Sequence, residues 1–172
     1  MPTLSAHQVA AEIRSRVNAD KMKVQKLLYF AQAIHYAETD QPLFVEKVKA
    51  WKDGPVVPDV WQADRKNTTW WDRPEEVTEF QTAILDWTVA EYGHLSPLQL
   101  RALTHRAGGP WERHYAGPVT SNEIPLAEMI EDIEHLGIKE SREEAQRIRA
   151  SRPDPFNPPP LPDELVAHLL NR

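Results

Sequence analysis

The sequence predicts a mainly α-helical protein: a compact multi-helix domain with a short β element near residues 46–52 and a proline-rich C-terminal arm ending in a short helix. Three observations lead to this fold class. Apolar residues recur at spacings of three and four along several segments, as they do on one face of an α-helix. Apolar and polar residues alternate at 46–52, which is typical of a strand. Residues 153–162 hold six of the fifteen prolines, which favours a stiff, extended segment.

Two helices are expected at the N-terminus, at about 6–18 and 21–39. Ser5 followed by Gln8 predicts a capping box for the first helix, and Asp20 is a candidate cap for the second. The second helix carries an apolar stripe from Val24 to Ile34, and aromatic residues widen it. A helix that is apolar on so many sides is expected at the centre of its domain.

The segment from 46 to 61 predicts a strand, a turn and a helix start. The turn is expected at residues 53–55, which read Asp-Gly-Pro. Val57 precedes a proline and should therefore be extended. Pro58 can then occupy the first position of a short helix.

Further helices are expected after this corner. Pro74 is a suitable start for a helix over about 74–92, which Gly93 would end. Ser96, followed by Pro97 and Gln99, is the clearest helix start in the chain, because it combines a cap, a proline at the first position and a capping-box glutamine. We expect one more turn at 110–115 and another helix over 121–137.

These elements divide the chain into two parts: a helical domain over 1–137 and a charged, proline-rich arm over 138–172. The short amphipathic helix at 163–171 contains too few apolar residues to fold alone. We expect it to dock on its own domain, on a partner, or on a second copy, so a homo-oligomer formed through this arm remains open.

Composition excludes several classes of function. The chain has 172 residues, a net charge of −6, a pI near 5.6 and no cysteine. The acidic balance argues against direct nucleic-acid binding. There is no stretch of the roughly 20 apolar residues that a membrane span needs, and the first residues do not resemble a signal peptide. We therefore expect a cytoplasmic protein with no membrane association.

The common catalytic and metal-binding motifs are missing. The seven histidines form no HxxxH, HxH or HExxH pattern, which argues against a metal site. The sequence has neither a GxSxG nucleophile motif nor a phosphate-binding glycine loop. We predict no catalytic residue, no cofactor and no metal, and therefore no enzyme.

Two turn regions place polar groups beside tryptophans. One contains Trp51, Lys52, Asp53 and Trp61, and the other Thr104, His105, Arg106 and Trp111. They can be packed corners of a helical domain, or they can form a ligand pocket or a catalytic pocket. In the catalytic alternative, His105 would perform acid–base chemistry with Asp53 brought near it by the fold.

Several longer motifs, in order, resemble one known family. KVQKLLYFAQ over 23–32, QPLF at 41–44, VKAWKDGPVVPDVW at 48–61 and LSPLQLRALTHRAGGPWERHY at 95–115 are similar to segments of the Panacea antitoxin domain, a phage-associated, SocA-like family. The resemblance extends over about 5–135. The chain departs from the family pattern at Asp53, where relatives have an aromatic residue, and the arm lies outside the resemblance.

The resemblance implies an antitoxin of a bacterial or prophage toxin–antitoxin pair that neutralises a co-encoded toxin by direct binding. A related alternative is an adaptor that delivers the bound toxin to a protease. The family offers no catalytic residues to transfer to this chain. Because tryptophan and tyrosine are the usual anchors of protein interfaces, the candidate partner-binding residues are the polar and aromatic side chains of the turn regions. They are Trp51, Asp53, Trp61, Trp70, Trp71, His105 and Trp111.

Overall fold

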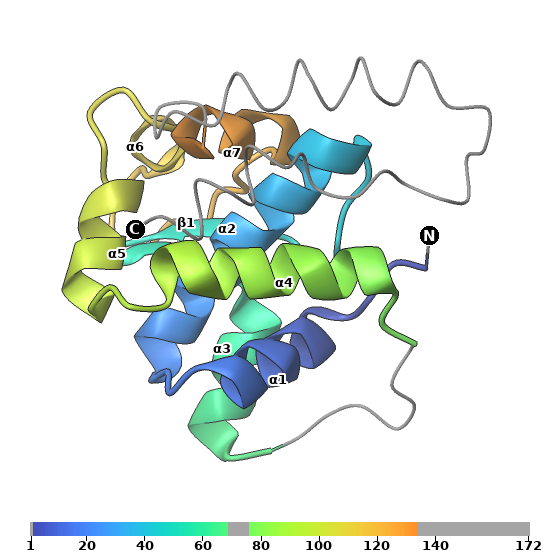
Figure 1. Cartoon of the computed structure of the whole chain (residues 1–172). Helices are drawn as coiled ribbons and strands as arrows, with labels where there is room; N and C mark the ends of the chain where they lie inside the picture. Colours follow the sequence, from blue (N-terminus) through green and yellow to red (C-terminus); the bar gives the residue numbers. More distant parts are fainter. Residues whose placement is uncertain (1, 69–75, 134–172) are drawn as a thin grey trace.

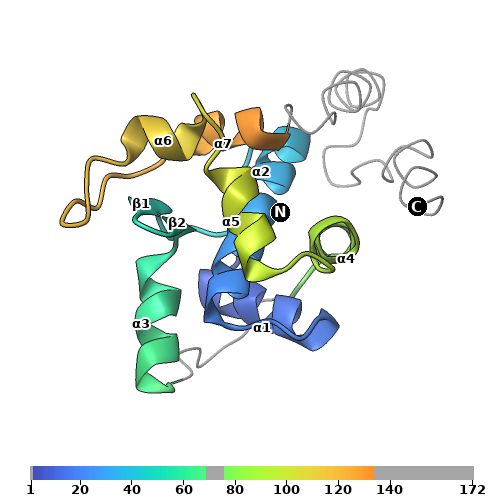
Figure 2. The same ribbon diagram turned by 90° about the vertical axis from the view of Figure 1, so that its left-hand side faces the viewer.

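Helix α2 (Lys21–Thr39) runs through the middle of the molecule, with the other elements arranged around it (Figure 1; Figure 2). The computed structural model describes residues 2–68 and 76–133. Fourteen of the nineteen residues of α2 are buried, as the apolar surface of this segment predicted. The mainly α-helical fold with one small β element is therefore confirmed for the described residues, and the C-terminal arm lies outside them.

Six further helices are present in the described part of the chain. They are α1 (Ala6–Arg16), α3 (Pro58–Lys66), α4 (Glu79–Tyr92), α5 (Pro97–Thr104), α6 (Pro110–His114) and α7 (Leu126–Ile133). All of them except α6 pack against α2, while α6 packs against α7 and the first strand. The core therefore surrounds α2 and includes Phe30, which stacks on Tyr92 of α4 with 4.2 Å between the ring centroids.

Several helix starts agree with the cap signals in the sequence. The Ser5 hydroxyl accepts a hydrogen bond from the Gln8 amide, and the Asp20 carboxylate accepts one from the Lys23 amide. Ser96 forms a complete capping box at the start of α5. Each cap satisfies a backbone N–H that has no partner within its helix.

Two helices begin later than the sequence suggested. Helix α4 starts at Glu79 rather than at residue 74, because Thr78 and Gln81 form a capping box there. Helix α7 starts at Leu126 rather than at residue 121. Residues 122–124 are extended instead, since they pair with the residues around Val48: the Ala50 amide donates to the Asn122 carbonyl at 2.8 Å, and the Ile124 amide donates to the Val48 carbonyl at 2.9 Å.

The β element is an antiparallel hairpin of β1 (Lys49–Trp51) and β2 (Gly54–Val56). Trp51 pairs with Gly54, so the turn consists of Lys52 and Asp53 and lies one residue earlier than expected. Gly54 has a φ of 110°, a conformation that L residues rarely adopt. The hairpin then leads through an extended Val57 into α3, as predicted.

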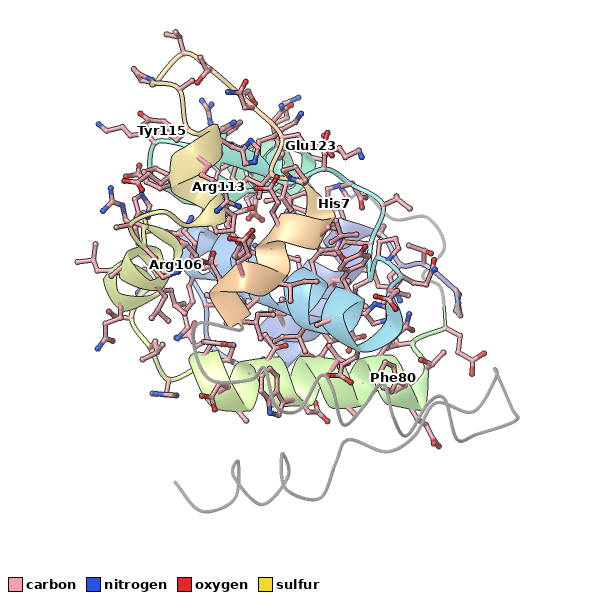
Figure 3. The ribbon with its side chains drawn as sticks, turned by 90° about the horizontal axis from the view of Figure 1, so that it is seen from above. His7, Phe80, Arg106, Arg113, Tyr115 and Glu123 are labelled. Atoms are coloured by element: carbon pink, nitrogen blue, oxygen red, sulfur yellow. The ribbon has the colours of Figure 1, made fainter. Side chains whose placement is uncertain are left out.

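A buried polar network joins α2 to α7. Tyr29 of α2 donates its hydroxyl to Asp132 of α7 at 2.7 Å, and Arg106 pairs with the same carboxylate at 3.2 Å. Arg106 comes from the loop after α5, while Arg113 approaches α7 from α6 (Figure 3). Burial raises the pKa of Asp132, an effect that the hydrogen bond from Tyr29 and the Arg106 charge oppose. The network fixes α7 and the loop after α5 against the central helix.

Candidate functional site

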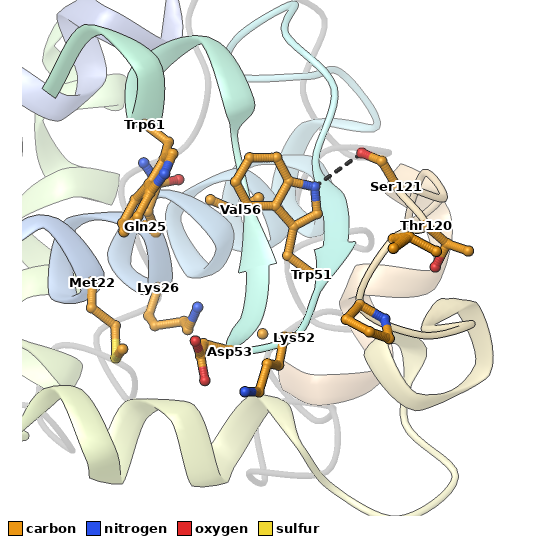
Figure 4. Close-up of a pocket in the computed structure, with 13 residues that line it drawn as sticks. Met22, Gln25, Lys26, Trp51, Lys52, Asp53, Val56, Trp61, Thr120 and Ser121 are labelled. Carbon is orange, nitrogen blue, oxygen red and sulfur yellow. Dashed lines mark hydrogen bonds between the residues drawn. The ribbon is translucent and has the colours of Figure 1, made fainter. Parts of the chain in front are cut away.

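A pocket of about 400 Å³ opens beside the hairpin (Figure 4). Four parts of the chain line it: the first turns of α2, the hairpin, Trp61 of α3, and residues 118–121. We call it the hairpin pocket. Its volume lies within the range of about 300–1,000 Å³ that is typical of ligand pockets.

Two tryptophans form walls of the hairpin pocket. Trp51 and Trp61 meet edge to face, with ring centroids 6.5 Å apart. The indole N–H of Trp51 donates to the Ser121 hydroxyl at 2.9 Å, which ties the loop at 118–121 to the hairpin (Figure 4). Both tryptophans are half-buried, and Val119 at the rim is 96% exposed.

A lysine lies at the base of the hairpin pocket. Lys26 of α2 is 2% exposed, and its Nζ donates to the Pro55 carbonyl at 3.0 Å. A Cβ at residue 54 would lie 2.8 Å from this Nζ, so any other residue there would displace the ammonium group. Burial lowers the pKa of Lys26 to about 7, a shift that Asp53 opposes and Arg101 increases.

The mouth of the hairpin pocket carries an exposed ion pair. Asp53 in the hairpin turn pairs with Arg101 of α5 at 3.4 Å, and its side chain is 60% exposed. Lys52, the other turn residue, also lines the pocket. The turn residues thus form a charged rim above aromatic walls.

The second turn region packs against the same hairpin. The indole N–H of Trp111 donates to the Trp51 carbonyl at 2.7 Å, and the ring lies 3.6 Å from that of His105 and 4.9 Å from that of Tyr115 between centroids. His105 in turn approaches the Lys52 carbonyl at 3.4 Å.

The fold thus joins the two turn regions of the sequence into one corner. Five of the seven candidate residues lie there: Trp51, Asp53, Trp61, His105 and Trp111. The other two, Trp70 and Trp71, lie outside the described residues.

The geometry gives little support to acid–base chemistry by His105 and Asp53. Both ring nitrogens of His105 face backbone carbonyls, that of Arg101 at 2.8 Å and that of Lys52 at 3.4 Å. Burial lowers the pKa of His105, which favours the neutral ring. Asp53 pairs with Arg101 instead. A general acid and base must reach a common substrate atom, and these two side chains are engaged elsewhere.

Sequence reasoning missed the two buried polar residues of the hairpin pocket, Gln25 and Lys26. They lie in the central helix α2, most of which is buried, and are 1% and 2% exposed. A buried polar group requires a partner, so a Gln-Lys pair inside an apolar helix was a usable signal. The loop at 118–121 carried no comparable signal.

The described residues contain neither a metal-binding cluster nor a membrane-spanning helix. No group of three or more histidine, cysteine or carboxylate side chains is arranged to hold a metal ion there. None of the helices in the same residues is both long and apolar enough to cross a membrane.

Comparison with known proteins identifies the family to which the segment around this corner is similar. The family model described as antitoxin SocA-like, Panacea domain, matches residues 24–112, which run from α2 into α6. The chain is also similar to antitoxin SocA of Caulobacter vibrioides (strain NA1000 / CB15N), at 28% identity over 120 residues. That match covers 58% of this chain and 62% of the relative, so the chain spans less than two-thirds of the relative's length. No solved structure matches the chain.

Proposed function

This chain belongs to the SocA-like antitoxin family that carries the Panacea domain, and on that premise we propose that it neutralises a co-encoded toxin by direct binding, without chemistry of its own. The proposed binding surface is the corner formed by the hairpin, the first turn of α3, the end of α5 and α6. Sequestration of the toxin is the proposed mode of action.

One observation carries this proposal. Within the segment that matches the family, the half-buried aromatic residues of both turn regions converge on one corner with a charged rim. Interface hot spots are often aromatic residues surrounded by contacts that exclude water, and the rim of an interface is polar. Trp51 and Trp61 line an open pocket, so a side chain of the toxin can enter it and pack against them.

The test uses the gene next to this one. We expect its product to arrest growth when it is expressed alone, and to become harmless and co-purify when this protein is co-expressed. A harmless neighbour, or two proteins that do not co-purify, would remove the main support for the proposal.

Two variants locate the surface. Trp61→Ala removes a pocket wall and should weaken toxin binding by about tenfold or more, as the loss of an interface anchor does. Leu98→Ala is the control, because Leu98 is 72% exposed on α5 and does not line the hairpin pocket. Circular dichroism should show that both variants fold. Equal binding by the two variants would place the interface elsewhere.

The same co-expression distinguishes sequestration from delivery to a protease. Sequestration predicts that the half-life of the toxin is unchanged, or longer, when this protein is present. An adaptor predicts a shorter half-life that recovers in a protease-deficient host.

A further inference from the structure

Two polar side chains at the base of the hairpin pocket have unused hydrogen-bond donors. The Gln25 side-chain carbonyl accepts from the Val57 amide at 2.7 Å, but the Gln25 side-chain N–H₂ has no partner in the described part of the chain. Lys26 carries three N–H donors, and among the described residues its Nζ makes one hydrogen bond, to Pro55. Both side chains are almost completely buried, and both line the pocket.

Unused buried donors favour a ligand that supplies acceptor oxygens. A buried polar group without a partner is costly, and a ligand that pairs with it removes this cost. A carboxylate suits an ammonium and an amide N–H₂ together, because it accepts several hydrogen bonds and pairs with the positive charge. The walls above are apolar, formed by Trp51, Trp61 and other side chains.

The charges around the pocket also favour an anion. Lys52 lines the pocket, and Arg101 pairs with Asp53 at the mouth. Both Asp53 and Arg101 act on the pKa of Lys26: Asp53 raises it and Arg101 lowers it. His105 is the other titratable group near Lys26, and burial lowers its pKa, so it adds little charge near pH 7. With Lys26 protonated, three positive groups and one negative group surround the pocket, in a chain whose net charge is −6.

We infer that the hairpin pocket receives a carboxylate of the toxin, from an aspartate, a glutamate or the chain end, with Lys26 and Gln25 as its donors and with an adjacent apolar side chain packed against Trp51 and Trp61. This inference rests on the proposed antitoxin function. It makes Lys26 the centre of the binding site rather than a buried structural residue.

The inference predicts a pH dependence for binding. A bound carboxylate stabilises the protonated form of Lys26, so its pKa rises above the value of about 7 in the free protein. Binding therefore takes up a proton in the range above pH 7. The affinity should fall as the pH rises from about 7 to about 9, by up to tenfold per unit.

The experiment compares Lys26→Met with Lys66→Met by calorimetric titration of the purified toxin. Methionine keeps most of the length of the side chain and removes the charge, while Lys66 is exposed at the end of α3 and serves as the matched control. We expect Lys26→Met to bind the toxin at least about tenfold more weakly near pH 7 and to lose the pH dependence. Lys66→Met should bind as the wild type does. Equal affinities for the two variants, or a wild-type affinity that does not change with pH, would overturn the inference.

A second arm does not need the toxin. Phenylacetate and its neutral analogue phenylacetamide are titrated into the full chain, and the indole N–H resonances of Trp51 and Trp61 are followed by NMR. We expect phenylacetate to shift these resonances at a lower concentration than the amide, and Lys26→Met to abolish the difference. Equal responses to the two compounds would show that the pocket does not recognise a carboxylate. If the wild type does not bind the toxin at all, the proposed function fails and toxin recognition by this pocket fails with it, whereas this arm still decides the chemistry of the pocket.

Discussion

Replacing Lys26 by methionine should raise the free energy of unfolding near pH 7. The pKa of this lysine is lowered from 10.5 to about 7, a difference of about 3.5 units, chiefly because burial disfavours its charged form. One unit corresponds to about 1.4 kcal/mol, so burial of the charge costs about 5 kcal/mol below pH 7 and about 4 kcal/mol at pH 7. Methionine cannot donate to the Pro55 carbonyl, which costs about 1–2 kcal/mol. The expected net gain at pH 7 is about 2–3 kcal/mol.

The gain should disappear in alkaline solution. Because the pKa is lower in the folded state, the unfolded chain binds more protons between about pH 7 and 10.5, and the stability of the wild type rises with pH in that window. By about pH 10 the cost of the buried charge has fallen to about 1 kcal/mol. The loss of the hydrogen bond to Pro55 then offsets the remaining cost of the buried charge, and the variant should be no more stable than the wild type.

Urea denaturation followed by tryptophan fluorescence measures this effect at several pH values. Lys66→Met is the control, since Lys66 is exposed and its replacement should change the free energy of unfolding by less than about 0.5 kcal/mol. If Lys26→Met is less stable than the wild type at pH 7, or if the difference between them is independent of pH, the argument that Lys26 is buried at a desolvation cost is wrong.

Four further substitutions test the fold by urea denaturation. Tyr29→Phe should destabilise the protein by about 1–3 kcal/mol, because the Tyr29 hydroxyl donates to the buried carboxylate of α7. Tyr92→Phe should be neutral or stabilising, because the buried Tyr92 hydroxyl has no partner among the described residues. Equal effects of the two substitutions would contradict these roles of the two hydroxyl groups. Gly54→Ala should lower the free energy of unfolding by more than about 2 kcal/mol, because φ is 110° at this residue and a Cβ would lie 2.8 Å from the Lys26 side chain. A smaller decrease would mean that the hairpin shifts easily. Ser96→Ala should cost about 1 kcal/mol through loss of the α5 cap, and no loss would make that cap unimportant.

Local signals in the sequence were sufficient to predict those features of the structure that depend on residues close together in the chain. Asp20 and Ser96 mark helix starts because a cap acts on an amide three residues away. The start of α4 was misplaced because Pro74 suggested an earlier start than the Thr78–Gln81 capping box provides. Both signals are local, and the sequence does not show which of them prevails.

The parts that were missed depend on contacts between distant residues. Residues 122–124 are extended because they pair with the strand around Val48, a contact that periodicity cannot reveal. Likewise, Lys26 reaches the hairpin only because the fold brings Gly54 against α2. The candidate site was therefore found as two separate turn regions, and their union around one pocket required the structure.

Hydrogen exchange of the full chain, measured with and without the purified toxin, reports where the toxin binds without any substitution. We expect the toxin to slow exchange in the hairpin at 49–56, in the following α3 helix and in the loop at 118–121, and to leave the exposed face of α4 unchanged. Slower exchange confined to α1 and α4, with the hairpin and the loop at 118–121 unaffected, would contradict the claim that the corner around the hairpin pocket is the toxin-binding surface.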